Sequence, residues 1–399
     1  MNIVILTENP FPDGPASTIR LTAYAHGMLA AGAGVNVLCT KATEPPGRNP
    51  RNREAQGVFE GIRFRYTAGT TIRPSSPFKR IFLYYSGFFK ARKELQKIHE
   101  ESKVDVLFTG LYNYWFTRSY YRWARKRGVL LVQERSEYPF IGVNGPLQKL
   151  KLRFYLRYTC RLFDVIVVIT KALEAYFSKW IRGDARIYLL PMLVEADKFR
   201  HPVQKPEHLP DRYIAYVGNM QGEKDGVPVL IESFAKISAV YPDVHLVLIG
   251  DTEFEGFGRL ESLVGKLGIA DRVHFTGRLH LDELPGYLSG ACCLALARPA
   301  NKQAEGGFPN KLGEYLAAGR PAVLTSVGEI PGHLTDGENA FISLPGDPDA
   351  FAAKLSEVIG DPGRADKIGA QGSKLVETVF NPLVQAEKML KFFNEIKKG

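Results

Sequence analysis

Short apolar runs rich in β-branched residues alternate with longer stretches of helical periodicity through the first half of the chain. Strands that are covered by helices on both faces become near-continuous apolar runs, so this alternation predicts βαβ units around a parallel sheet. The runs lie at residues 2–6, 34–39, 104–109, 129–133, 164–170 and 186–190. The first half is therefore expected to form a Rossmann-like α/β domain.

The same alternation starts again in the second half, after a polar, proline-bearing stretch at residues 197–212 that is typical of a linker. Its apolar runs lie at residues 213–217, 244–249, 272–276, 291–297 and 321–325. At roughly 100 to 200 residues per domain, a chain of 399 residues also suggests two domains. Ligands of open α/β sheets bind outside the carboxyl ends of the strands, so two facing units predict a deep interdomain cleft.

Positive charge is concentrated in the first half of the chain. Residues 1–200 contain 32 Lys and Arg against 16 Asp and Glu, whereas residues 201–399 contain 20 against 26. Basic and aromatic residues mix in helical stretches at 73–97, 118–127 and 147–161. Such helices can lie on anionic lipid headgroups, although ordinary solvated helix faces explain the pattern as well. Nucleic acid is not an expected partner, because no nucleic-acid-binding motif accompanies the charge.

The expected location is the cytoplasm, either free or peripheral on the inner face of the membrane. The four cysteines lack metal-ligand spacing, and sparse cysteines suit a reducing compartment. No stretch approaches the ~18 uninterrupted apolar residues of a spanning helix, and the first residues lack the basic segment of a secretion signal.

The most informative segment is EGGFPNKLGEYLAAGRPAV at residues 305–323. Its glycines let the backbone approach a ligand, and Pro309 suits the first position of a helix. A helix that opens after such a loop directs free N–H groups and partial positive charge at a phosphate, and Lys311 adds a cation. Glu314 lies on a neighbouring helical face, where its carboxylate can accept two hydrogen bonds from ribose hydroxyls. An ordinary capped surface helix with a Lys/Glu pair accounts for these residues equally well.

Together with the run at 291–297, EIP at 329–331 and DGEN at 336–339, this segment resembles the signature region of retaining group 1 (family 4) glycosyltransferases of the GT-B fold. It is similar to the variant that carries F-P-x-K-x-x-E-Y-x-A-x-G-x-P. The resemblance implies an acceptor-binding Rossmann-like domain at 1–196 and a nucleotide-sugar donor domain at 197–380. A helix within 381–399 would cross back to the first domain.

In that family, two acidic residues separated by seven others flank the start of the helix. The first touches the donor sugar and the second touches the ribose. Glu314 matches the second position, whereas the strict first position is Gly306, so Glu305 would need a one-residue shift of the loop. The donor-side residues implied in this segment are Glu305, Gly307, Phe308, Pro309, Asn310, Lys311 and Glu314. Backbone N–H groups at Gly307 and Phe308 would hold the sugar hydroxyls.

A second match follows the first strand of the second domain, where Gly218 and Asn219 open a loop that carries Lys224. In the resembled family a lysine here binds the donor pyrophosphate, so Lys224 and Lys311 would share its charge. Many members carry an arginine at the position of Asn219, which leaves two expected phosphate cations rather than three. A later post-strand turn contains Arg278, where the family reads the base edge; a solvent-facing arginine is the alternative.

The first domain offers candidates in two post-strand loops. Gly14 is the best match to the glycine-bearing loop that reaches the donor phosphates, although the usual Gly-Gly pair is absent and a purely structural turn is the alternative. Glu134, Arg135 and Glu137 stand where many members keep a histidine near the reacting sugar. The two carboxylates are candidates for assisting deprotonation, and Arg135 and Glu137 for binding the acceptor. A structural salt-bridge cluster remains an alternative.

The resemblance implies retaining transfer of a sugar from a nucleotide diphosphate sugar, expected to be UDP-linked, to a hydroxyl of a glycan or lipid-linked saccharide, in cell-surface polysaccharide or glycolipid assembly. The catalytic candidates are Glu305, Lys311, Lys224, Glu134 and Glu137. No metal is expected, because cations can stabilise the leaving group, and no cofactor other than the donor. Two other functions use the same donor site. A GT-B-fold epimerase would form product from the donor alone, and a nonenzymatic nucleotide-sugar binding module would bind without turnover.

Overall fold

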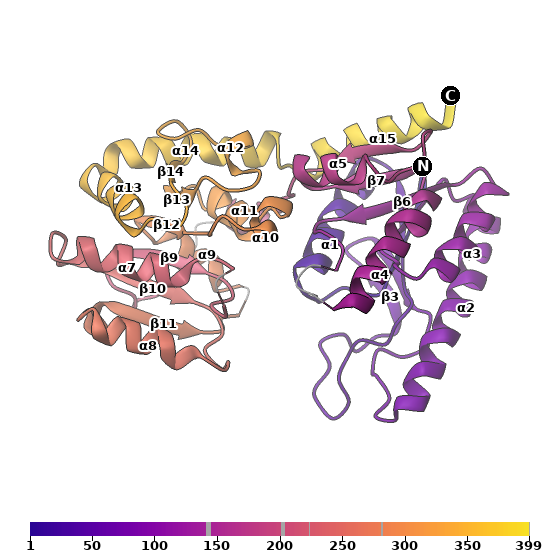
Figure 1. Ribbon diagram of the computed structural model, residues 1–399, viewed down its shortest axis with the longest axis horizontal. Coiled ribbons are helices and arrows are strands. Elements are labelled where there is room, and N and C mark those ends of the chain that lie inside the picture. Colours follow the sequence, from indigo (N-terminus) through magenta and orange to yellow (C-terminus); the bar gives the residue numbers. More distant parts are fainter. Residues whose placement is uncertain (141–144, 201–203, 223, 281, 399) are drawn as a thin grey trace. The chain divides into compact units, whose positions relative to one another are not determined.

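The computed structural model describes residues 1–140, 145–200, 204–222, 224–280 and 282–398. The chain divides into two compact units, each with one sheet flanked by helices (Figure 1). Unit 1 comprises Met1–Leu193 and Pro382–Gly399, and unit 2 comprises Val194–Asn381. The domain boundaries expected from the sequence, after residues 196 and 380, lie close to these divisions.

The sheet of unit 1 has eight strands in the order β3-β4-β2-β1-β5-β6-β7-β8. The strands are β1 (Asn2–Thr7), β2 (Gly34–Cys39), β3 (Gln56–Phe59), β4 (Ile62–Tyr66), β5 (Val106–Thr109), β6 (Leu130–Arg135), β7 (Val165–Val168) and β8 (Arg186–Leu189). All neighbours are parallel except β3 and β4, which form an antiparallel hairpin at the edge. The apolar runs of the sequence coincide with the other strands. This hairpin was not expected, because β3 is largely exposed and β4 alternates apolar with basic residues.

Strand β1 is the point at which the strand order of unit 1 reverses, because it pairs with β2 on one side and with β5 on the other. Crevices at the carboxyl edge of a sheet form at such a point. The helices of the unit are α1 (Ala16–Ala30), α2 (Pro77–Ser102), α3 (Tyr114–Arg125), α4 (Pro146–Phe154), α5 (Lys171–Phe177) and α15 (Pro382–Lys398). A π-helical turn, η1 (Tyr155–Thr159), and a 3-10 turn, η2 (Cys160–Leu162), continue α4.

Helix α15 completes the core of unit 1. Its buried residues Ala386, Met389, Leu390 and Phe393 belong to the same hydrophobic cluster as Ile5. The ring of Phe393 meets that of Phe108 edge to face, with centroids 5.7 Å apart. Helix α15 lies against α1, as the yellow ribbon of Figure 1 shows. The last helix of the chain is therefore an integral part of the first unit.

The sheet of unit 2 has six parallel strands in the order β11-β10-β9-β12-β13-β14. The strands are β9 (Arg212–Val217), β10 (Val244–Ile249), β11 (Val273–Gly277), β12 (Cys293–Leu296), β13 (Ala322–Thr325) and β14 (Phe341–Ser343). The chain builds outward from β9 through β10 to β11, and then returns to place β12 on the other side of β9. The strand order thus reverses between β9 and β12, and this reversal locates the candidate site.

Helices cover both faces of this sheet. They are α6 (Asp197–Arg200), α7 (Val227–Ser238), α8 (Phe257–Lys266), α9 (Leu284–Ser289), α10 (Lys302–Gly306), α11 (Asn310–Ala317), α12 (Ile330–His333), α13 (Pro348–Gly360) and α14 (Pro362–Thr378), with the 3-10 turn η3 (Ala270–Arg272). Among the helices in the part of the chain that the structure describes, none is both long and apolar enough to cross a bilayer.

Candidate functional site

The loops that follow β9 and β12, together with the first turn of α11, meet at the reversal point of the sheet in unit 2. The loop after β9 contains Gly218, Asn219 and Lys224 and leads into α7. Helix α11 begins at Asn310, one position later than the sequence suggested, and Pro309 is its N-cap residue rather than its first helical residue. Its first turn contributes Lys311. The sequence-predicted phosphate-binding residues of unit 2 are therefore carried by neighbouring elements.

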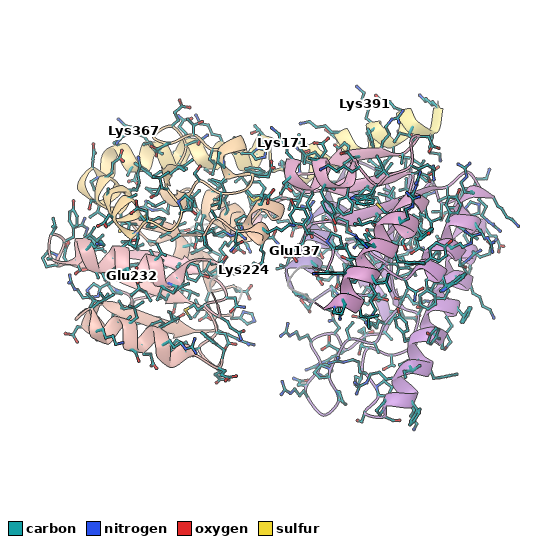
Figure 2. The ribbon with its side chains drawn as sticks, viewed as in Figure 1. Glu137, Lys171, Lys224, Glu232, Lys367 and Lys391 are labelled. Carbon is teal, nitrogen blue, oxygen red and sulfur yellow. The ribbon has the colours of Figure 1, made fainter. Side chains whose placement is uncertain are left out.

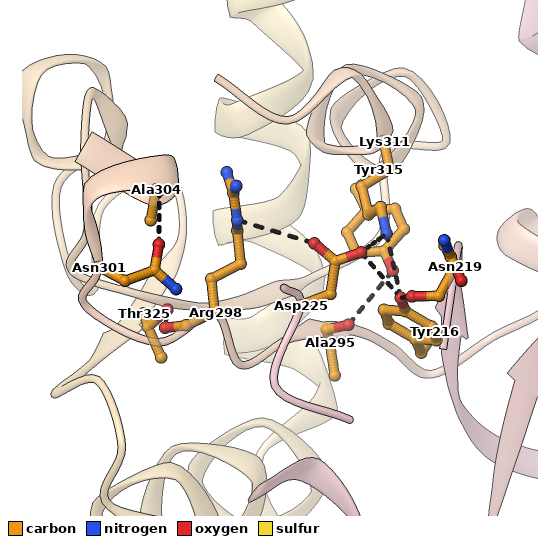
Figure 3. Close-up of polar contacts among 10 residues, drawn as sticks. All are labelled: Tyr216, Asn219, Asp225, Ala295, Arg298, Asn301, Ala304, Lys311, Tyr315 and Thr325. Carbon is orange, nitrogen blue, oxygen red and sulfur yellow. Dashed lines mark hydrogen bonds and ion pairs between the residues drawn. The ribbon is translucent and has the colours of Figure 1, made fainter. Parts of the chain in front are cut away.

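A buried charge cluster forms where these elements meet (Figure 3). The ammonium group of Lys311 donates hydrogen bonds to the Asp225 carboxylate and, over 3.1 Å, to the hydroxyl of Tyr216. Arg298 lies on the other side of Asp225, with its Nε 3.7 Å from Oδ1. The side chains of Asp225, Arg298 and Lys311 are 5%, 3% and 15% exposed. A single carboxylate thus links two cations at the edge of the sheet.

Two glycines permit this close approach. Gly226, the N-cap of α7, has a φ of +69°, and a Cβ there would lie 1.8 Å from the carbonyl oxygen of Ala297. Gly218 has a φ of +151°, and its Cβ would lie 1.9 Å from Nζ of Lys311. Positive φ and contacts of this kind restrict both positions to glycine. The backbone therefore leaves room for the ammonium group and little else.

Tyr315 fixes α11 to the sheet. Its hydroxyl accepts a hydrogen bond from the N–H of Val217, over 3.1 Å, and donates one to the carbonyl of Ala295, over 3.2 Å. These groups belong to β9 and to β12, the two strands between which the order reverses. The buried Tyr315 thus fixes the position of α11 relative to strands β9 and β12.

Around the ammonium group of Lys311, positive charge exceeds negative charge. Burial lowers the pKa of Lys311 from its ordinary value; Asp225 opposes this effect, and the positive charges of Arg298 and Lys224 add to it. Burial also raises the pKa of Tyr216, so this phenol stays neutral and can donate. Its hydroxyl lies 3.0 Å from Oδ2 of Asp225. An anion that approached the cluster would find one carboxylate against three cationic side chains.

Glu314 and Glu305, the two acidic candidates of the motif, lie in different surroundings. Glu314 is 26% exposed and forms an ion pair with Nζ of Lys198, from α6, at 3.2 Å. Glu305 is exposed on α10, a short helix where the sequence indicated a loop. Asn301 caps that helix by accepting a hydrogen bond from the N–H of Ala304. The helix fixes the register of the segment, with Gly306 buried and Glu305 directed outward.

The remaining residues of the motif connect α10 to the start of α11. Phe308 is 5% exposed, and its ring stacks on His333 at 5.4 Å and meets Phe380 edge to face at 5.7 Å. Its side chain therefore packs into unit 2, which leaves only its backbone for a ligand. Gly307 precedes it in an extended conformation. Pro309 and Asn310 are half-buried at the start of α11.

The other unit 2 candidates are exposed. Asn219 accepts a hydrogen bond from the N–H of Gln221, which closes the turn after β9. Lys224 lies exposed in the same loop and is labelled in Figure 2. Arg278 is 70% exposed and pairs with Asp251 at 2.6 Å, so it joins the loops after β11 and β10. This ion pair stands where the sequence reading expected contact with a base.

In unit 1, Glu134 is held by a buried arginine that the sequence reading did not single out. Arg20, on α1, donates from Nε to Glu134 at 2.8 Å and from its terminal nitrogens to the carbonyls of Leu190 and Pro191. Its side chain is 4% exposed. The carboxylate of Glu134 is thereby fixed at the end of β6.

Arg135 and Glu137 have different surroundings, and Gly14 lies in the segment before α1. Arg135 is buried against the ring of Tyr112, at 3.8 Å, and donates to the hydroxyl of Tyr155 and to two backbone carbonyls. These contacts favour the structural alternative for Arg135. Glu137 is exposed and is labelled in Figure 2. Gly14 lies two residues before the start of α1, and a Cβ there would lie 2.2 Å from the hydroxyl of Thr18.

Asp225, Arg298 and Tyr216 were not predicted from the sequence. For two of them the sequence holds a local signal but does not show that they pair: Arg298 stands directly after the apolar run of β12, and Asp225 directly follows Lys224. A charged residue at the carboxyl end of a buried strand is costly unless it is paired, which makes it a candidate for a site. Among the described residues, no group of three or more His, Cys, Asp or Glu side chains could hold a metal ion.

Two family models match the chain. One, described as "Glycosyl transferases group 1", covers residues 211–361, and the other, "Glycosyl transferase 4-like domain", covers residues 16–192. Among curated proteins, the chain is 25% identical over 219 residues to the "GDP-mannose-dependent alpha-(1-6)-phosphatidylinositol monomannoside mannosyltransferase" of Mycolicibacterium smegmatis, which covers 52% of this chain and 56% of that protein. The chain spans about half the length of the curated relatives it matches.

Solved structures share the fold of the whole chain. Sucrose-phosphate synthase from Thermosynechococcus elongatus has a TM-score of 0.71 at 18% identity and covers 99% of both chains. Anabaena HepE in complex with UDP has a TM-score of 0.66 at 13% identity and covers 99% of this chain and 100% of that one. At these identities the likeness establishes the fold alone.

Proposed function

The chain belongs to the group 1 glycosyltransferases and has their GT-B fold, and from this premise we propose that it transfers a sugar from a nucleotide diphosphate sugar to a hydroxyl of a glycan or lipid-linked saccharide. The observation that carries the proposal is the buried Lys311 cluster at the point where the strand order of unit 2 reverses. A lysine at a helix start, backed by a second buried cation, suits a diphosphate leaving group.

In this proposal the cluster acts on the charge that develops when the sugar leaves. The bond between the anomeric carbon and the β-phosphate oxygen breaks, and a bond from the acceptor oxygen to that carbon forms on the same face. The departing phosphate takes the acceptor proton. Lys311, Lys224 and the N–H groups of the first turn of α11 stabilise the phosphate, and Asp225, held by Arg298, keeps the ammonium of Lys311 in place. Glu314 binds the ribose, and Lys198 orients it.

Unit 1 supplies the acceptor side of the proposal. Glu137 is exposed in the loop after β6 and contacts the acceptor, while Glu134, fixed by Arg20, lies at the end of the same strand. The basic character of this half of the chain supports an acceptor held at an anionic membrane surface on the cytoplasmic side.

We expect UDP to be the nucleotide of the donor, and a thermal-shift comparison of UDP with GDP tests this. GDP is the alternative because GDP-mannose stands in the name of the mycobacterial relative. A ligand at 100 times its Kd stabilises the native state by about 2.7 kcal/mol, which gives a readily measured rise in Tm. UDP should raise the Tm and UMP, which lacks the β-phosphate, should do so far less. Failure of both diphosphates to shift the Tm would contradict the donor assignment.

Diphosphate binding is expected to weaken at alkaline pH, and to do so below the ordinary pKa of lysine. Burial lowers the pKa of Lys311, so its charge is lost at a lower pH than that of an exposed lysine, as the pH rises through the lowered value. The diphosphate stays fully ionised over this range, so the loss of attraction reports the lysine. Isothermal titration calorimetry with UDP or GDP at increasing pH measures the loss of affinity. The proton uptake that accompanies binding is measured in the same experiments. An identical alkaline decline in Lys311→Met would assign it to another group.

A further inference from the structure

The first half of α2 carries large apolar side chains that stay exposed in the part of unit 1 that the structure describes. None of residues 77–86 is buried, although they form regular helix. The exposed side chains are Phe78 (85%), Ile81 (59%), Phe82 (73%), Tyr85 (48%) and Phe89 (62%). Counted from Phe78, the other four follow after three, four, seven and eleven residues, which places all five on one side of the helix. We call these five residues the α2 stripe.

The opposite side of the same helix is anchored in unit 1. Gly87, Phe88, Ala91 and Leu95 are the buried residues of α2, and the ring of Phe88 stacks on Phe116 of α3 with centroids 3.7 Å apart. Helix α3 in turn meets α4 through Tyr114 and Phe154. The α2 stripe is therefore presented by a helix that contacts the rest of unit 1 from Tyr84 onward, while its first turns extend further, as Figure 1 shows for the start of α2.

Within residues 77–93, the charged side chains of α2 are all of one sign. Residues 77–93 include Lys79, Arg80, Lys90, Arg92 and Lys93 and no Asp or Glu. The neighbouring segment 145–163 has the same character, with Lys149, Lys151, Arg153, Arg157 and Arg161 and no acidic residue. Its exposed apolar residues Leu147, Leu150, Phe154 and Tyr158 also recur at helical spacing. Apolar side chains flanked by cations complement a surface that is apolar beneath an anionic layer.

We propose that the α2 stripe inserts into the headgroup region of an anionic lipid bilayer, with Lys79, Arg80 and Lys90 on lipid phosphates. This deepens the proposed function by giving the acceptor side a lipid partner and an inserting element. Attraction by charge alone falls steeply with salt, whereas buried apolar surface does not. Binding is therefore expected to weaken with salt without being abolished. A protein partner is less well matched, because a stable protein interface pairs its charges with opposite ones and here a single sign dominates.

Cosedimentation of the full chain with vesicles tests the proposal. Phosphatidylcholine vesicles containing phosphatidylglycerol should bind the chain, and pure phosphatidylcholine vesicles should bind it more weakly. The double substitution Phe78→Ser and Phe82→Ser should reduce partitioning at least about tenfold, because each removes apolar area that the bilayer buries. A matched control substitutes Val240→Ser and Leu344→Ser, two apolar residues of unit 2 that are 70% and 65% exposed. This control should bind like the parent chain.

A second readout separates insertion from loose adsorption. Trp115, at the start of α3 beside the contacts of α2, is 72% exposed. Its fluorescence should shift to shorter wavelength on binding anionic vesicles, and the shift should be lost in Trp115→Phe.

Three results would overturn the proposal: no binding to anionic vesicles, equal binding by the stripe variant, or binding abolished entirely by salt. Concentration-dependent dimerisation that the Phe78/Phe82 variant abolishes, without vesicle binding, would assign the stripe to a second copy of the chain. Nucleotide binding in the thermal-shift assay involves unit 2 alone in this scheme. It therefore shows separately whether the donor assignment or the lipid assignment has failed.

Discussion

Replacing Lys311 by methionine is expected to lower the rate of sugar transfer by roughly two to three orders of magnitude, the effect typical of removing one preorganised group that stabilises transition-state charge. The side chain is nearly buried, and its ammonium already faces a carboxylate at the site proposed for the diphosphate. Methionine is also unbranched and only one heavy atom shorter, and it removes the charge together with the hydrogen-bond donors of the ammonium group. The loss should therefore fall mainly on kcat, with a smaller effect on the binding of UDP or GDP.

The measurement is a transfer or donor-hydrolysis assay on purified chain, with folding checked by circular dichroism and thermal unfolding. Lys367→Met provides the matched control, because Lys367 is an exposed lysine of α14 in the same unit (Figure 2). It should keep the parent rate. Near-parent turnover in a well-folded Lys311→Met variant would remove the lysine from the mechanism.

Replacing Asp225 by alanine is expected to destabilise unit 2 by about 3 to 5 kcal/mol, the range found when one partner of a buried ion pair is removed. The substitution would leave Arg298, at 3% exposure, and Lys311 as neighbouring buried cations without their shared carboxylate. Repulsion between them adds to the cost of burying each charge. Asp225→Asn keeps the shape and one acceptor oxygen, so its loss should be smaller.

Urea unfolding followed by circular dichroism measures this difference, with attention to the transition of unit 2. Asp349→Ala is the control, because Asp349 pairs with Lys236 at 2.7 Å and is 81% exposed. An exposed pair of this kind contributes about 0 to 1 kcal/mol. If Asp225→Ala lowered the free energy of unfolding no more than this control does, the buried charge cluster would not stabilise unit 2.

The parallel sheets could be predicted because fully covered strands leave a simple pattern. The runs at 2–6 and 244–249, for example, coincide with β1 and β10. The β3–β4 hairpin leaves no such pattern, since Arg63 and Arg65 point from one face of β4, next to the edge strand, and only alternate residues are buried. The short helix α10 was also missed, because Gly306 at its end and Gly307 after it indicate a loop. Asn301 can be recognised as its cap only when the fold shows the N–H of Ala304 donating to it.

The site divides in a similar way. Lys311 and Glu314 could be selected from the sequence because they lie in one ordered motif whose helix places them together. Asp225 and Arg298 could not, because they are separated by a long stretch of chain and meet only through the order of strands β9 and β12. Arg135 shows the opposite case. Its position in a charged cluster suggested an acceptor contact, whereas tertiary packing covers it with Tyr112 and Tyr155.

Helix α15 has a consequence for the order in which the chain can mature on the ribosome. Four of its side chains fill the core of unit 1, and they are synthesised only after all of unit 2. Unit 2 is contiguous in sequence and can complete its sheet while the core of unit 1 still lacks helix α15. The usual expectation that amino-terminal domains mature first is therefore reversed here. Until translation reaches Phe393, apolar surface around α1 stays open to chaperones.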